Sequence, residues 1–97
     1  MQVCHAREQY VRWLLVTRYL SPHTVRAYHT DIAMLERYLG ARACVQQINH
    51  EGLMAFIEAQ RAAGLCSTSI RRRACGIRGF CRWLLDTRLL ESDPWGR

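Results

Sequence analysis

The sequence contains no lysine, so all 14 of its strongly basic side chains are arginines, against eight acidic residues. The formal net charge is +6 at pH 7. Arginine pairs with phosphate groups through two parallel hydrogen bonds, and an excess of positive charge favours a polyanionic partner. Charge alone does not establish DNA binding, since many basic domains bind no nucleic acid.

Long apolar runs are missing as well. No run reaches the ~18 residues that a membrane-spanning helix needs. Residues 1–13 interrupt their apolar positions with charge, unlike a signal peptide. The sequence therefore predicts no membrane partner, and we expect a cytoplasmic protein.

Patterns that carry chemistry are equally scarce. The four histidines show neither i, i+4 spacing nor an H-E-x-x-H pattern, which argues against the common zinc motifs. There is no G-x-S-x-G turn, no glycine-rich phosphate loop and no paired carboxylate constellation; the acids lie mostly at expected solvent-side positions. We therefore expect no metal, no cofactor and no catalytic residue.

The cysteines and tyrosines are predicted to be structural. Five cysteines, an odd number without C-x-x-C spacing, argue against a disulfide framework and predict reduced, mostly buried thiols. The four tyrosines lie at or beside apolar positions, which is typical of core aromatics. The residues are Cys4, Cys44, Cys66, Cys75 and Cys81, and Tyr10, Tyr19, Tyr28 and Tyr38.

The 97 residues have the length of one small domain, and two prolines with no β-branched alternation predict an all-α fold. Ser21, Asn49 and Ser67 are expected helix N-caps. Gly40 and Gly64 are expected to end helices, Gly40 in a left-handed conformation. Apolar periodicity then predicts four helices, over residues 7–18, 22–39, 49–64 and 67–85.

The fourth predicted helix carries a basic face. Its expected core stripe is Ile70, Ala74, Ile77, Cys81 and Leu84, which places Arg71, Arg78 and Arg82 on one flank. On the side away from the core we expect Arg72, Gly76, Gly79 and Trp83. The two glycines indicate close approach of something large, another helix or a phosphate backbone, of which helix packing is the simpler interpretation.

The second predicted helix has a polar outer strip of cation, imidazole and hydroxyl groups. Such a strip can donate to phosphates and to base edges, although an outward row of arginines is as often a solvated surface. The strip consists of His23, Arg26, Thr30 and Arg37.

Four segments resemble, in order and spacing, those of the tyrosine-type site-specific recombinases, the phage-integrase and Xer family. "LSPHTVRAYHTDI" is similar to L-S-x-x-T-x-x-A-Y-x-x-D-L. "STSIRRRACGIRGFCRWLL" is similar to S-x-x-T-I-x-R-R-L-S-A-I-R-x-F-x-R-Y-L. Shorter matches are "INHEGLMAFI", similar to I-T-x-x-D-L-x-x-F-L, and "ESDPW", similar to a closing D-N-P.

The resemblance implies the N-terminal core-binding domain of that family, a SAM-like orthogonal bundle of four to five helices. The domain would occupy residues 1–97, with the start of a linker at about 92–97. In the family this domain forms half of a clamp around the recombination core site, and a separate domain carries catalysis. The implied partners are double-stranded DNA and other recombinase subunits, in a bacterial or phage-encoded system.

The resemblance also implies DNA contacts from the second and fourth helices, which cross the major groove in the family. The matching residues are His23, Thr24, Arg26, Ala27, Thr68, Arg71 and Arg72, to which the outer faces add Thr30 and Arg78. Arg26 or Arg72 could pair with a guanine. Two alternatives remain at this point: a helical protein-interaction module, and a helix-turn-helix type of DNA-binding regulator.

Overall fold

The computed structural model describes residues 1–96. Over these residues the chain forms four α-helices and one short 3₁₀ helix, and the prediction of an all-α fold is confirmed. The elements are α1 (Val3–Val16), α2 (Pro22–Leu39), η1 (Val45–Gln47), α3 (His50–Ala62) and α4 (Ser67–Asp86). Among these helices none is long and apolar enough to cross a bilayer.

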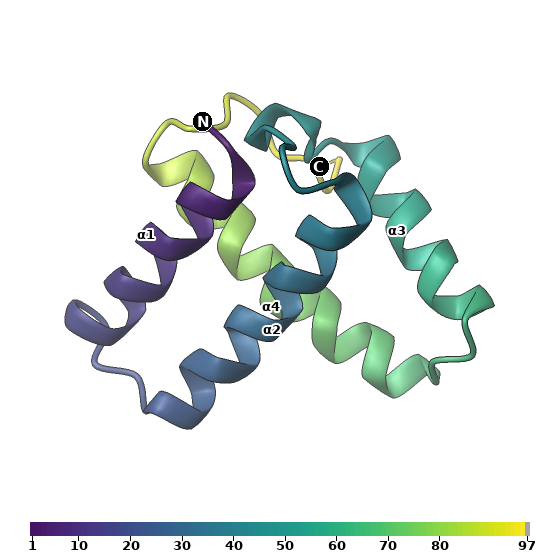
Figure 1. Ribbon diagram of the computed structural model, residues 1–97, viewed down its shortest axis with the longest axis horizontal. Coiled ribbons are helices and arrows are strands. Elements are labelled where there is room, and N and C mark those ends of the chain that lie inside the picture. Colours follow the sequence, from purple (N-terminus) through teal and green to yellow (C-terminus); the bar gives the residue numbers. More distant parts are fainter. Residues whose placement is uncertain (97) are drawn as a thin grey trace.

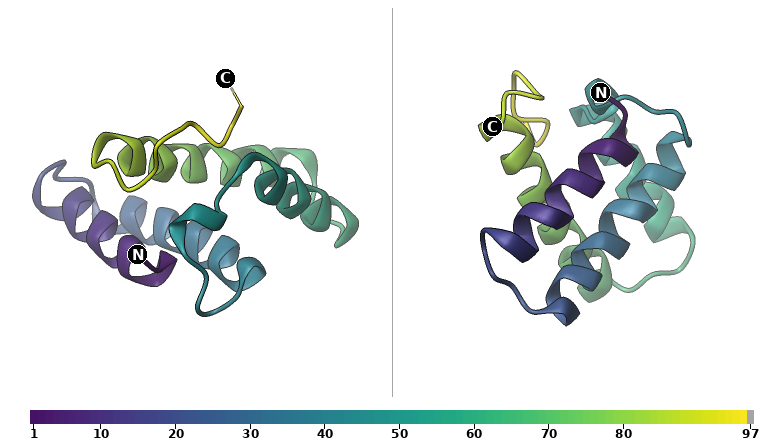
Figure 2. Two further views of the ribbon diagram at one scale, coloured as in Figure 1. Left: turned by 90° about the horizontal axis from the view of Figure 1, so that it is seen from above. Right: turned by 60° about the vertical axis from the view of Figure 1, so that its left-hand side comes forward.

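Two helical pairs are stacked crosswise. Figure 1 shows α4 crossing α2 near the middle of the molecule. Seen from above in Figure 2, α1 and α2 form one layer, while α3 and α4 form the other. The first turns of α2 and α4 lie at the lower side of Figure 1, and the ends of both helices lie at its upper side.

The core lies between these layers and draws on every helix. Tyr10 of α1 packs its ring 5.3 Å from that of Phe80 and 5.4 Å from that of Trp83, both on α4. Burying aromatic and aliphatic side chains of this size contributes on the order of 2 kcal/mol each. The largest fully buried side chains are Phe80, Leu14, Ile32, Leu35, Ile48, Leu53, Ile77 and Leu84.

Two of the four tyrosines are not core residues, so that prediction was wrong for them. Tyr19 is 85% exposed, in the turn between α1 and α2, where its φ of 53° is unusual for a non-glycine residue. Tyr38 is 46% exposed near the end of α2. Tyr10 is buried as predicted, and burial raises its pKa to about 12.

The first helix begins at Val3, earlier than the predicted Arg7. Val3 and Ala6 are fully buried, and the Val3 N–H donates to the carbonyl of Ala43 at 2.8 Å. The partners of this first turn come from the segment before η1, far along the chain. Local periodicity therefore could not reveal that the helix extends so far toward the N-terminus.

The N-caps follow the prediction in α2 and α3. The side-chain oxygens of Ser21 and Asn49 each accept the backbone N–H three residues on, at 3.2 and 2.8 Å. The fourth helix differs, because Cys66 is its N-cap and Ser67 is its first helical residue. The cap predicted at Ser67 was therefore one residue too late.

The C-terminal end of α2 differs from the prediction. Gly40 has φ 115° and ψ 150°, a glycine conformation outside the left-handed helical region that we predicted. Gly64, with φ 96°, follows the end of α3. There the N–H of Gly64 donates to the Arg61 carbonyl at 3.0 Å and that of Leu65 to the Gln60 carbonyl at 3.2 Å, which is the Schellman pattern.

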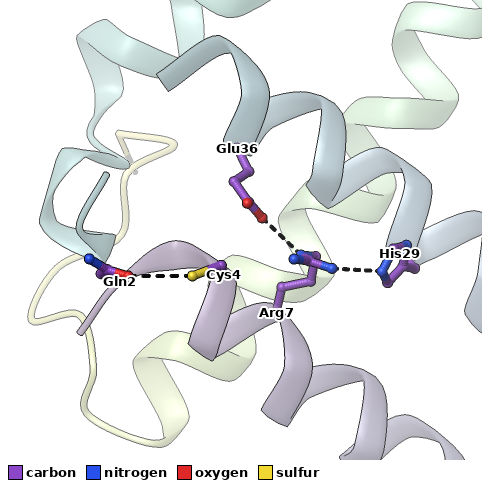
Figure 3. A network of polar contacts seen from close by, with 5 residues as sticks. All are labelled: Gln2, Cys4, Arg7, His29 and Glu36. Atoms are coloured by element: carbon purple, nitrogen blue, oxygen red, sulfur yellow. Dashed lines mark hydrogen bonds and ion pairs between the residues drawn. The ribbon is translucent and has the colours of Figure 1, made fainter. Parts of the chain in front are cut away.

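A polar contact joins α1 to α2 (Figure 3). Arg7 of α1 donates from Nε to Glu36 Oε1 at 2.8 Å and from Nη1 to His29 Nε2 at 2.7 Å. Because an arginine only donates, His29 accepts through Nε2 and carries its ring proton on Nδ1. Through this contact Glu36, the one acid of α2 that faces α1, gains a hydrogen-bond donor of opposite charge.

The segment after α4 packs back onto the domain. His50 donates from Nδ1 to the carbonyl of Pro94 at 3.3 Å, and Pro94 itself is buried. The guanidinium of Arg78 lies 4.8 Å from the centre of the Trp95 ring. The expected linker start at 92–97 is thus docked as far as residue 96, while its last residue lies outside the described part of the chain.

Candidate nucleic-acid interface

The first halves of α2 and α4 meet beside the helix crossing and form an open hollow of about 320 Å³. Five residues predicted to contact DNA lie together here, four from α2 and one from α4. The lining consists of His23, Arg26, Ala27 and Thr30, with Arg72 of α4, and of two further residues, Asp31 and Arg73.

Gly76 of α4 allows α4 and α2 to pack closely against each other at their crossing. A Cβ atom at this position would lie 2.5 Å from Oδ2 of Asp31, a distance that real Cβ atoms do not reach. A Cβ on Gly79 would lie 3.0 Å from the hydroxyl oxygen of Tyr10 on α1. The glycines therefore serve helix packing, and the prediction that Gly76 faces away from the core was wrong.

The prediction that Trp83 faces away from the core was also wrong. It is 8% exposed and packs in the core, whereas Ala74 of the predicted stripe is only half-buried. The fourth helix contacts all three other α-helices, α1, α2 and α3. Its buried surface is therefore broader than the single stripe that a helical period predicts.

Asp31 is the acid beneath the hollow, and it is 3% exposed. Its Oδ1 accepts a hydrogen bond from Nε of Arg73 at 3.4 Å. Burial raises the pKa of Asp31, and the positive charges of Arg72 and then Arg73 oppose that rise. Sequence reasoning treated the acids as mostly solvent-facing and passed over Arg73. The available signal was spacing: Arg73 lies three residues after Ile70 and four before Ile77, so it falls on the face that carries the apolar stripe.

Among the described residues, the hollow is lined by no acidic side chain other than Asp31, which is paired with Arg73. The sequence has no acid in residues 9–30 or 59–85, so the first halves of both helices are free of other carboxylates. Exposed Arg26 and Arg72 flank the hollow, and Arg73 balances the charge of Asp31. A phosphate approaching here would meet a positive potential.

The remaining predicted residues lie outside the hollow. Thr24 and Thr68, on the first turns of α2 and α4, and Arg71, directly after the first turn of α4, are exposed but do not line it. Arg78 lies further along α4, against Trp95. Within the hollow, the hydroxyl of Thr30 donates to the carbonyl of Arg26 at 3.0 Å, so its oxygen remains available as an acceptor.

The described residues hold no clustered metal ligands, and their cysteines are free thiols. Residues 1–96 contain no cluster of three or more histidine, cysteine or acidic side chains able to hold a metal ion. All five cysteines are free thiols, but three are exposed, so the prediction of mostly buried thiols was wrong. Cys81 is buried, which raises its pKa to about 12 and suppresses thiolate chemistry.

Known proteins resemble the chain over most of its length. The family model described as phage integrase, N-terminal SAM-like domain, matches residues 8–88. Tyrosine recombinase XerC of Xylella fastidiosa (strain M23) is 36% identical over 89 residues, which cover 90% of this chain and 30% of the relative.

Two further relatives show the same pattern of coverage. Tyrosine recombinase XerC of Xanthomonas campestris pv. campestris (strain B100) is 31% identical, over 92% of this chain and 28% of its own length. Tyrosine recombinase XerD of Chlamydia trachomatis serovar D is 30% identical, over 91% and 29%. The chain thus spans less than a third of the curated relatives that it matches. No solved structure matches it.

Proposed function

We propose, from the premise that the chain belongs to the phage integrase family of N-terminal SAM-like domains, that it binds double-stranded DNA through the first halves of α2 and α4. The observation that carries the proposal is the hollow between these helices. Two arginines, a histidine and a threonine from the predicted set line it, and its only acid is paired with a third arginine.

The side chains divide by what they can reach. Arg26 and Arg72 are exposed at the rim, where an extended guanidinium can pair with a guanine edge or a phosphate. His23, Thr24 and Thr68 lie on the first helical turns. The N–H of Thr24 already donates to Ser21, whereas the first turn of α4 has no side-chain cap, so its free backbone N–H groups also favour phosphate. Arg71 and Arg78 extend the positive surface along α4 and would add affinity without sequence information.

For the whole protein, we propose a role in site-specific DNA recombination. The relatives are named tyrosine recombinases, and this chain aligns with less than a third of each. In this proposal the domain holds the core recombination site as one half of a clamp, beside other recombinase subunits. DNA cleavage and rejoining belong to a separate catalytic domain, and the setting is the bacterial cytoplasm.

A titration of a fluorescent duplex at several salt concentrations tests the binding surface. The variant Arg26→Ala/Arg72→Ala is expected to bind more weakly than the parent. If both arginines contact phosphates, its slope of log K against log salt is shallower by about 1.8, since each phosphate contact contributes about 0.9.

The matched control is Arg42→Ala/Arg88→Ala. It removes the same charge from exposed residues that follow the ends of α2 and α4, at the opposite side of the domain. We expect its slope to stay near that of the parent. Equal weakening of both variants would assign binding to net charge alone. Absence of salt-dependent binding in the parent would contradict the proposed function.

A further inference from the structure

Arg73 differs from the other arginines of α4 in how its side chain is held. It is 14% exposed and donates from Nε to Oδ1 of Asp31, at 3.4 Å, from one side of the helix crossing to the other. Among residues 1–96 its two terminal nitrogens make no hydrogen bond, and the side chain lines the hollow. A guanidinium has five N–H donors, so most of its donor capacity remains free.

We propose that this hollow seats one backbone phosphate of DNA, with Arg73 as the phosphate ligand and Asp31 as the residue that positions it. The inference rests on the proposed DNA binding and names what the floor of that surface recognises. Asp31 engages the Nε edge of the guanidinium, which leaves the terminal edge for phosphate oxygens. His23, Arg26 and Arg72 surround the same space.

The burial of the ion pair favours a phosphate over a base edge. Reaching into a groove would require Arg73 to leave Asp31, and a buried carboxylate without its partner is strongly unfavourable. A phosphate can instead approach the hollow from outside while the ion pair stays intact. Exposed Arg26 and Arg72 are not restrained in this way and remain the candidates for base contacts.

The proposal predicts that removing the carboxylate of Asp31 weakens DNA binding, whereas the change in net charge alone would strengthen it. Removing a carboxylate from a DNA-binding domain normally strengthens its attraction for the polyanion. Asp31→Ala is expected to weaken binding severalfold, because Arg73 loses its positioning partner. Glu36→Ala is the matched control: Glu36 lies on the same helix and is paired with Arg7, on the side facing α1. This variant is expected to bind as tightly as the parent or more tightly.

Arg73→Gln tests the ligand independently of Asp31. Its salt slope is expected to be shallower than that of the parent by about 0.9, the contribution of one phosphate. Arg42→Gln, which removes one charge from the exposed loop after α2, should leave the slope unchanged. In the Arg73→Gln background, Asp31→Ala should cause no further weakening, because Asp31 acts through Arg73. Asp31→Asn keeps an acceptor for Nε and should recover most of the parental slope.

Circular dichroism checks that every variant folds. If Asp31→Ala does not fold, the salt slopes of Arg73→Gln and Asp31→Asn test the phosphate seat without it. An unchanged salt slope in Arg73→Gln, or tighter binding by a folded Asp31→Ala, would overturn the phosphate seat and leave the proposed function standing. Relaxed sequence preference at an unchanged slope would assign Arg73 to a base edge and overturn it too. A parent that binds no DNA would overturn both proposals.

Discussion

At the scale of single residues, Asp31 is the only acid buried among residues 1–96. Burial raises its pKa above the ordinary value despite two arginines nearby, so the folded protein binds this proton more tightly than the unfolded chain. The contribution of Asp31 to stability is therefore fully present below pH ~3.9 and is lost as the pH rises through the raised pKa. The ion pair with Arg73 thus serves position more than stability.

Asp31→Asn isolates this effect. Between pH 4 and pH 7 the free energy of unfolding of the parent, measured relative to that of the variant, is expected to fall, because only the parent must ionise a buried group. Urea titrations at intermediate pH values measure the difference. A difference that grows in favour of the parent as the pH rises would mean that the pKa of Asp31 is lowered in the folded state, contrary to the account.

At the scale of elements, the crossing of α2 and α4 depends on Gly76. Gly76→Ala gains about 1 kcal/mol of helix propensity, but its Cβ would overlap the carboxylate of Asp31 and push the helices apart, at a cost of about 1–3 kcal/mol. We expect net destabilisation of up to about 2 kcal/mol, seen as a lower urea midpoint at an unchanged m-value.

Gly79→Ala is the control for this substitution. It lies on the same helix and gains the same propensity, but its Cβ would meet only the end of the Tyr10 side chain, at 3.0 Å. We expect it to be close to neutral. Should Gly76→Ala prove as stable as Gly79→Ala, the close crossing would not be the reason for glycine at position 76.

At the scale of the whole molecule, the sequence predicts most of the fold but only part of the site. Local signals fix α2, where a serine cap, a proline and a regular apolar period agree. They miss the first turn of α1, whose partner is Ala43, and the breadth of the α4 core, which contacts three helices. The outer strip of α2 and the resemblance bring five residues of the hollow together. Local sequence patterns do not reveal the pairing of Asp31 with Arg73, because the two residues are 42 positions apart.

The charge distribution gives the domain two unlike ends. The first halves of α2 and α4 carry arginines without exposed acids, whereas Asp86 ends α4 and Glu91 and Asp93 follow it. A polyanion should therefore approach from the lower side of Figure 1.

The most direct test of the central claim is an NMR titration of the ¹⁵N-labelled domain with a DNA duplex, followed by backbone amide shifts. We expect the largest changes within residues 22–31 and 67–78, on the first halves of α2 and α4. Changes concentrated in the turns that follow these helices, at residues 40–44 and 87–93, would contradict it.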